Sequence, residues 1–222
     1  MMEKEKERVD ESMRGRRPRM AVFGGSFNPV HNGHLLLAGD IIRQGVADEV
    51  LFVPARVPPH KRDMDILPGA VRMEMLKLAI EPYSQFSVSD IELGEQCKSG
   101  YTFDTMAALS RAFVDVELSF LIGMDSLLDI HSWFKASELI GRYTFITYPR
   151  PGFPAPNAAD LATRIGPRNA SKLLASIVDA PSVAISSTGV RETAAKGLTL
   201  AGLVPPGVEA LISERHLYRK QS

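Results

Sequence analysis

Residues 20–34 read MAVFGGSFNPVHNGH, an apolar run followed by two glycines and a polar turn. The run Met20–Gly24 is short and ends at glycines, which is typical of a buried strand. A helix is predicted directly afterwards, because the apolar residues of His34–Gly45 fall on one helical face. A strand that passes through a glycine turn straight into a helix is the opening unit of an α/β sheet.

The same alternation continues along the chain. Further strands are predicted at Glu49–Pro54, Phe86–Leu93, Glu117–Ile122, Tyr143–Tyr148 and Val183–Ile185. Helices are predicted at Ala70–Ile80, Thr102–Phe113, Ser126–Ile130, Asn157–Ser176 with a break at Gly166-Pro167, Gly189–Lys196 and Val208–Glu214. Alternation of this kind requires right-handed parallel crossovers. The sequence therefore predicts an α/β fold, doubly wound, with a mainly parallel sheet, helices on both faces and a ligand site at the carboxyl ends of its strands.

Composition excludes several functional classes. The chain has 222 residues, 45% hydrophobic and 23% charged, and these values are typical of a globular protein. Its 26 Lys and Arg balance 26 Asp and Glu, whereas proteins that bind bulk nucleic acid usually carry a basic excess. No apolar run approaches 18 residues, so no membrane association is expected. The single cysteine, Cys97, fits the reducing cytoplasm, which we expect to be the location of the protein.

Residues 1–19 differ from the rest, because they are rich in charge and almost free of apolar side chains. We expect a disordered tail there and a single domain over 20–222. An arm that binds nucleic acid through Arg14, Arg16, Arg17 and Arg19 is the less favoured alternative.

The turn after the first predicted strand suits a polyphosphate. Gly24 and Gly25 let the backbone approach a ligand closely, and the N-terminus of the following helix directs unpaired N–H groups toward the turn. His31 and His34 are three residues apart and can face the same side. Neither G-x-G-x-x-G nor G-x-x-x-x-G-K-[ST] occurs here, and a zinc site is disfavoured because no third ligand lies nearby.

A helix start is predicted near the carboxyl end, in the stretch ISSTGVR at 185–191, which on its own is more often an ordinary N-cap than a phosphate site. Ser187 or Thr188 could cap a helix that begins near Gly189, leaving N–H groups for phosphate oxygens. Arg191 would add a charge with the fork geometry that suits phosphate.

GGSFNPVHNGH and ISSTGVR resemble the two signatures of the nucleotidyltransferase superfamily that shares the H-x-G-H motif. Intermediate segments are similar to those of the nicotinate-nucleotide adenylyltransferases: VPPHK at 57–61, YT and DT at 101–105, GMDSL at 123–127, HSWF at 131–134 and RPG at 150–152. The resemblance extends from residue 20 to 218. It implies a Rossmann-like nucleotidyltransferase fold, and transfer of AMP from ATP to nicotinate mononucleotide in NAD biosynthesis.

The resemblance also implies roles for individual residues. Charge stabilisation in the reaction would fall to His34, His31 and Arg191. ATP would be bound by Gly24, Gly25, Ser26, Phe27, His31, His34, Ser187, Thr188 and Arg191. Nicotinate mononucleotide would be bound by Ser26, His60, Lys61, Thr102, Asp125, Trp133, Phe134 and Arg150, with Trp133 against the ring and backbone N–H groups near Thr102 and Phe134 on its carboxylate. Mg²⁺ would be held mainly by the ATP phosphates, without a metal site made of side chains.

Among the positions that depart from the family pattern, Asn28 stands where Asp is frequent, and Phe134 stands where Tyr is frequent. Several readings stay open beside the favoured one. A sister enzyme could act on nicotinamide mononucleotide or phosphopantetheine, or could transfer CMP, although the GMDSL–HSWF block argues against the pantetheine enzymes. A nucleotide-binding regulator without activity is the alternative from another class. A homo-oligomer is possible, and the sequence does not decide it.

Overall fold

A parallel sheet forms the centre of the molecule. The computed structural model describes residues 16–56, 66–94, 97, 99–181 and 183–219. The strands are β1 (Arg19–Gly25), β2 (Glu49–Pro54), β3 (Phe86–Val88), β4 (Glu117–Gly123) and β5 (Thr144–Tyr148). They are ordered β3-β2-β1-β4-β5, and every pair is parallel. The prediction of a doubly wound, parallel α/β fold is confirmed.

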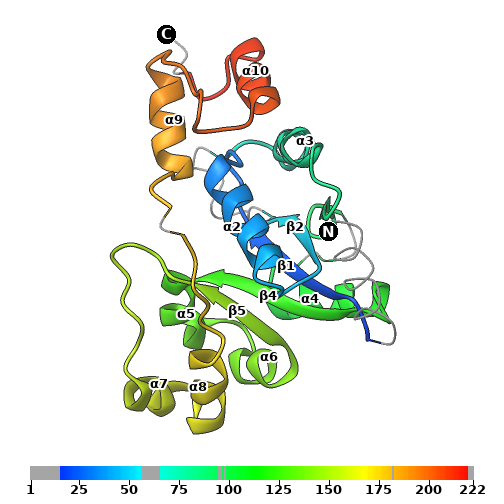
Figure 1. The fold of residues 1–222 in the computed structure, drawn as a ribbon, viewed down its shortest axis with the longest axis vertical. Helices are drawn as coiled ribbons and strands as arrows, with labels where there is room; N and C mark the ends of the chain where they lie inside the picture. The colour runs from blue at the N-terminus through cyan, green and yellow to red at the C-terminus, as the bar shows by residue number, and fades with distance from the viewer. Residues whose placement is uncertain (1–15, 57–65, 95–96, 98, 182, 220–222) are drawn as a thin grey trace, which may run out of the picture.

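Helices cover both faces of this sheet (Figure 1). One core contains side chains of α2 (Asn32–Arg43), α3 (Gly69–Ile80), α9 (Ser187–Ala195) and α10 (Pro206–Glu214). The other contains side chains of α4 (Thr102–Ala112), α5 (Met124–Asp129), α6 (Ala136–Arg142), α7 (Ala158–Ile165) and α8 (Pro167–Leu174). Strand β1 supplies Ala21 and Phe23 to the first core, and Met20 and Val22 to the second. This alternation follows from the two-residue period of a strand and explains why β1 is apolar throughout.

The strand order places a ligand site next to β1. The chain proceeds from β1 outward to β2 and β3, and then returns through α4 to β4 on the other side of β1. The connections after β1 and β4 therefore diverge, which opens a crevice at the carboxyl ends of these two strands. Both strands end in glycine, at Gly25 and Gly123.

Two predicted strands are corrected. The predicted strand Phe86–Leu93 ends at Val88, because the ladder with β2 ends at the pair Phe52 and Val88 and a turn over 90–94 follows. The segment Val183–Ile185 forms no strand with any described residue. It packs against α2 instead, and Val183 and Ile185 line the crevice.

The boundary of the predicted tail also differs. Strand β1 already begins at Arg19. Arg16 donates to both carboxylate oxygens of Asp48, at 2.9 and 2.7 Å, and the backbone N–H of Arg19 donates to the same carboxylate at 2.8 Å. These contacts lower the pKa of Asp48 to about 2 against the opposing effect of its burial. Residues 16–19 therefore belong to the folded unit, and residues 1–15 lie outside the described part.

Candidate active site

A cavity of about 610 Å³ lies in the crevice at the carboxyl ends of β1 and β4. It brings together most of the residues predicted from sequence: Gly24, Gly25, Ser26, Phe27, His31, His34, Thr102, Asp125, Trp133, Arg150, Ser187, Thr188 and Arg191. Phe134 is not among the described lining residues, and His60 and Lys61 lie outside the described residues. Segments that are about 150 residues apart in sequence thus converge on one pocket.

The two signature segments are tied to each other by hydrogen bonds. Nη1 of Arg191 donates to the carbonyl oxygen of Asn28 at 2.9 Å, and Nη2 is 3.3 Å from Oγ1 of Thr188. Oγ of Ser187 donates to the carbonyl oxygen of Pro29 at 2.9 Å. The hydroxyl that we expected to serve ATP therefore holds the loop after β1. These bonds engage loop carbonyls whose lone pairs would repel a phosphate.

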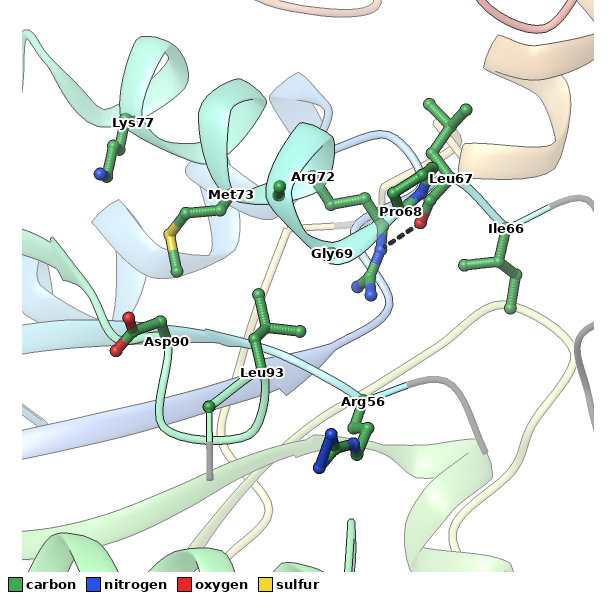
Figure 2. A pocket seen from close by; sticks show the side chains of 12 residues that line it. Arg56, Ile66, Leu67, Pro68, Gly69, Arg72, Met73, Lys77, Asp90 and Leu93 are labelled. Atoms are coloured by element: carbon green, nitrogen blue, oxygen red, sulfur yellow. Dashed lines mark hydrogen bonds between the residues drawn. The ribbon is translucent and has the colours of Figure 1, made fainter. Parts of the chain in front are cut away.

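Arg72 of α3 holds the same loop from the opposite side. Its side chain is almost fully buried, at 1% exposure. Its guanidinium donates to three carbonyl oxygens, of Ser26 at 2.7 Å, Ala55 at 2.9 Å and Leu67 at 2.9 Å. Figure 2 shows the bond to Leu67 and the neighbouring cavity of about 910 Å³, into which the Arg72 side chain projects. One buried cation thus joins the ends of β1 and β2 to the segment that precedes α3.

His31 and His34 lie against each other at the start of α2. Their rings are stacked, with centroids 3.6 Å apart and planes at 24°. The backbone N–H of His31 donates to Nδ1 of His34 at 3.2 Å. Because Nδ1 of His34 accepts this bond, the proton of the neutral ring is on Nε2, where it can be donated to a ligand.

Both histidines are neutral at physiological pH. Burial lowers the pKa of His31 to about 4, and the charge of Arg150 contributes further. Burial, followed by the neighbouring His31 and Arg150, also holds the pKa of His34 well below its usual value. A neutral imidazole that donates one hydrogen bond is therefore what the unliganded site presents to a phosphate.

Gly33 is required by the packing around the histidines. A Cβ atom at this position would lie 2.3 Å from Cγ1 of Val183 and 3.0 Å from Nδ1 of His31. Both contacts are shorter than van der Waals distance. The glycine between the histidines therefore lets the segment at 183–185 close over α2, which explains the spacing H-x-G-H in physical terms.

The N-terminus of α9 faces the same pocket. Ser187 and Thr188 are the first two residues of this helix, and both line the cavity. The N-cap is Ser186, whose Oγ accepts from the N–H of Gly189 at 3.1 Å, so the prediction of Ser187 or Thr188 as cap is corrected. The helix therefore begins at Ser187, and its first amides, which lack partners within the helix, are available to an anion.

Phe27 has a structural role that the sequence did not predict. Its side chain is 1% exposed, and its ring packs edge-on against Phe23, Phe52 and His34. It lies beneath the pocket and supports the His34 ring, with a ring-centroid distance of 5.0 Å.

Asp125 and Arg150, both expected to bind the mononucleotide, form an ion pair with each other. Asp125 follows β4, Arg150 follows β5, and both line the pocket. The ring of Tyr148 lines the same wall, and burial raises the pKa of its phenol. Arg150 is half-exposed, so its guanidinium stands at the rim of the pocket, where it pairs with Asp125 and lies 5.9 Å from the ring centroid of Phe153.

Trp133 is both a core residue and part of the pocket wall. Its ring packs edge-on against Phe120, with centroids 6.2 Å apart, and it lines the cavity. Thr102 lies in the same cavity as the first residue of α4, where the backbone N–H has no partner within the helix. Trp133 and α4 pack on one core, whereas α2 and α9 pack on the other, so the two ends of the pocket lie on opposite sides of the sheet.

Three features of the site escaped sequence reasoning. Arg72 sits in a helix whose pattern gave no sign of a buried cation. Glu92 lines the pocket, accepts from Oγ1 of Thr105 at 2.7 Å and from the N–H of Arg56 at 3.1 Å, and has a pKa raised by burial. Oδ1 of Asn28 accepts from the phenol of Tyr218 at 3.0 Å. The only sign of this last contact in the sequence was that Asn28 stands where the family pattern often has Asp.

Two classes of feature are absent from the described part of the chain. No group of three His, Cys, Asp or Glu side chains is placed to hold a metal ion. None of the described helices combines the length and the apolar character that crossing a bilayer requires.

Comparisons with known proteins agree with this architecture. The family model for cytidylyltransferase-like proteins matches residues 22–193. The "Probable nicotinate-nucleotide adenylyltransferase" of Clostridium perfringens (strain SM101 / Type A) is 35% identical over 203 residues, 91% of this chain and 99% of that protein. The nicotinate-nucleotide adenylyltransferase of Bacillus subtilis (strain 168) is 34% identical over 90% of this chain and 98% of its own length.

Solved structures show the same fold. Plasmodium falciparum nicotinic acid mononucleotide adenylyltransferase complexed with NaAD superposes with a TM-score of 0.71 at 19% identity, and the match covers 90% of this chain and 97% of that one. Together with the sequence relatives, which are aligned over nearly their whole length, these matches identify the chain as a member of the cytidylyltransferase-like family and, within it, of the nicotinate-nucleotide adenylyltransferases.

Proposed function

We propose that this protein transfers the AMP group of ATP to nicotinate mononucleotide, giving nicotinate adenine dinucleotide and pyrophosphate. The observation that carries the proposal is the convergence of His31 and His34 with Ser187, Thr188 and Arg191 on one pocket. The relatives that share more than a third of the sequence carry the name of this activity.

The reaction forms one bond and breaks one bond at the α-phosphorus of ATP. A 5′-phosphate oxygen of the mononucleotide attacks in line, and the bond to the β-phosphate oxygen breaks, so pyrophosphate leaves with the electron pair. The attacking oxygen is already ionised at neutral pH, and no protein nucleophile or strong base is required. Catalysis then reduces to aligning two anions and stabilising the charge that develops on the transferring group.

The chain supplies donors for that charge. His34 donates from Nε2 to an oxygen of the α-phosphate, and His31 donates to the neighbouring phosphate. The first amides of α9, Thr188 and Arg191 bind the β- and γ-phosphates and then the leaving pyrophosphate. These donors are already oriented before the substrate binds, so little reorganisation is needed as the charge develops.

The mononucleotide occupies the other end of the pocket. Its ring lies against Trp133, and its carboxylate accepts from the backbone at Thr102 and Phe134. Its phosphate lies near Ser26 and Arg150. Phe134 stands where the family pattern often has Tyr, and in this proposal its backbone N–H binds the carboxylate, so a ring hydroxyl is not needed for that contact.

A divalent cation enters with ATP in this proposal. Mg²⁺ commonly takes substrate phosphates and water as ligands, and Asp125, a carboxylate that lines the pocket, is paired with Arg150. When bound, the cation would shield the charge of the triphosphate, and the side chains described above would hold and orient the nucleotide.

A two-substrate assay tests the proposal. Purified protein with Mg²⁺ and ATP is given nicotinate or nicotinamide mononucleotide, and pyrophosphate release and the mass of the dinucleotide are measured. We expect dinucleotide formation with at least a tenfold preference in kcat/KM for the acid. Equal rates would contradict acid specificity, and binding of ATP without any product would favour the inactive regulator.

A further inference from the structure

Two exposed aromatic rings meet beside the ring-binding end of the pocket. Tyr101 is 50% exposed and Phe134 is 42% exposed. Their rings are stacked, with centroids 4.5 Å apart and planes at 23°. Side chains that remain this exposed contribute little to the hydrophobic core. Their stacking is therefore not explained by core packing.

The stack joins the two segments that supply Thr102 and Trp133. Tyr101 directly precedes Thr102 at the start of α4, and Phe134 directly follows Trp133. Thr102 and Trp133 line the pocket, whereas the rings of Tyr101 and Phe134 are on its outer side. Each ring is therefore one residue away from a wall of the space expected to hold the pyridine ring.

Lys135 makes a second tie between the same segments. Its ammonium lies 4.8 Å from the ring centroid of Phe103, in the first turn of α4, and 5.6 Å from that of Phe134. Its backbone is in the left-handed region, with φ of 52°. A residue with a side chain is strained there and persists only when its surroundings hold it.

We propose that Tyr101 and Phe134 are positioning residues, which clasp the two pocket segments together and set the width of the slot between Thr102 and Trp133. The inference rests on the proposed function, since the slot is where the pyridine ring of nicotinate mononucleotide would bind. Without the clasp, the start of α4 and the segment at 133–134 separate, and the ring loses contact with Trp133 and the carboxylate loses its backbone donors. ATP binds at the other end of the pocket and is not affected.

The chain offers a matched control for this idea. Tyr83 is 43% exposed and stacks on Phe86, with centroids 4.7 Å apart and planes at 25°. Phe86 is the first residue of β3, so this stack lies at the amino edge of the sheet, opposite the pocket. Removal of either tyrosine ring deletes an exposed ring and its stacking contact, although Phe86 itself is buried, and only Tyr101 is next to the site.

The test compares Tyr101→Leu, Tyr101→Phe and Tyr83→Leu in the full-length protein. We expect Tyr101→Leu to raise the KM for nicotinate mononucleotide about tenfold, which corresponds to about 1.4 kcal/mol. Its KM for ATP and its kcat should stay within about twofold of the wild-type values, as expected when only binding of one substrate is lost. Tyr101→Phe keeps the ring and should behave as wild type, and so should Tyr83→Leu.

Binding provides a readout that does not depend on turnover. Trp133 is the only tryptophan of the chain, so its fluorescence reports on the proposed slot directly. Titration with nicotinate mononucleotide should give a dissociation constant about tenfold weaker for Tyr101→Leu. The loss in the double variant Tyr101→Leu/Phe134→Leu should be smaller than the sum of the losses in the two single variants, because both single variants remove the same stack.

The outcomes separate this inference from the proposed function. An unchanged mononucleotide affinity in Tyr101→Leu, or an equal loss in Tyr83→Leu, would overturn the clasp. An equal rise in the KM for ATP would also overturn it, because the effect would then be a general loosening of the site. Failure of the wild-type protein to form the dinucleotide would instead overturn the proposed function.

Discussion

The guanidinium of Arg191 lies 2.9 Å from the carbonyl oxygen of Asn28, a contact between residues 163 positions apart in the chain. The same side chain reaches Thr188, so one fork links the loop after β1 to the first turn of α9. Arg191 therefore has two tasks in the proposed mechanism, as it shapes the loop and carries charge for the phosphates.

Replacing Arg191 by Lys tests whether both tasks matter. Lysine keeps the charge but cannot hold two acceptors in a planar fork. We expect the KM for ATP to rise about tenfold and kcat to fall. Steady-state kinetics will measure this, with Arg142→Lys as control, because Arg142 is exposed on α6 and its guanidinium lies over the ring of Tyr143. Equal kinetics for the two variants would show that the fork is dispensable.

His34→Ala removes the donor assigned to the α-phosphate. Loss of one such donor typically costs about 10²–10³ in kcat, and we expect a fall of at least about 10²-fold in pyrophosphate release. The exposed His131 is the matched control, and His131→Ala should retain wild-type kcat. Far-ultraviolet circular dichroism will check that the fold is kept. Near-normal turnover in His34→Ala would contradict the mechanism.

The buried histidines make stability depend on pH. The pKa of His31 is about 4 in the folded protein, against 6.5 when unfolded. As pH falls below 6.5, His31 is protonated in the unfolded chain but stays neutral in the folded protein until the pH approaches 4. The free energy of unfolding therefore decreases. Between pH 7.5 and 5.5 this amounts to about 1 kcal/mol for His31.

Denaturant titrations at these two pH values will measure the decrease. His31→Gln should lose about 1 kcal/mol less than wild type over the interval, whatever its own stability. His131→Gln alters an exposed side chain and should keep the wild-type dependence. The same pH dependence in all three proteins would refute the assignment.

Tyr218→Phe removes the phenol that donates to Oδ1 of Asn28. The ring and its packing are kept, so only the hydrogen bond is lost, at a cost of about 1 kcal/mol. Since Asn28 also accepts from Arg191 through its carbonyl, we expect the KM for ATP to rise severalfold. Tyr143→Phe is the control, because its phenol contacts Ser110 far from the pocket. A change in melting temperature with an unchanged KM would assign Tyr218 to stability alone.

Arg72→Met would leave the carbonyls of Ser26, Ala55 and Leu67 without their shared donor. Each buried unsatisfied acceptor costs about 1–3 kcal/mol, so we expect the free energy of unfolding to fall by about 3 kcal/mol or more. Arg215→Met is the comparison, because Arg215 forms an exposed ion pair with Glu74 of the same helix α3. Exposed pairs are worth about 0–1 kcal/mol. Similar losses from both variants would exclude the proposed role of Arg72.

Apolar periodicity predicted the sheet well because four of its five strands are buried on both faces or nearly so. Segments such as Glu49–Pro54 therefore have the apolar run that the pattern detects. The segment 183–185 misled the prediction, because it is apolar in order to cover Gly33 and α2. Apolar periodicity indicates that a side chain is buried, but it does not indicate which element packs against that side chain.

The site was predictable where the chemistry is local. The glycine turn, the two histidines and the Ser-Thr-Arg turn are each short motifs, and the residues that give each motif its chemistry lie within a few positions of one another. Arg72 and Tyr218 act through contacts with the loop from 46 and 190 positions away in the chain. Glu92 likewise depends on Thr105 and on the backbone after β2. A single sequence holds no record of such distant partners.

The bonds to the loop after β1 also set the order in which a newly made protein becomes competent. Ser187, Arg191 and Tyr218 hold the loop at 28–29, yet they are translated long after it. These hydrogen bonds to Asn28 and Pro29 cannot form until residues 187–218 have been translated. The final geometry of an early segment of the site therefore depends on the segments that are made last.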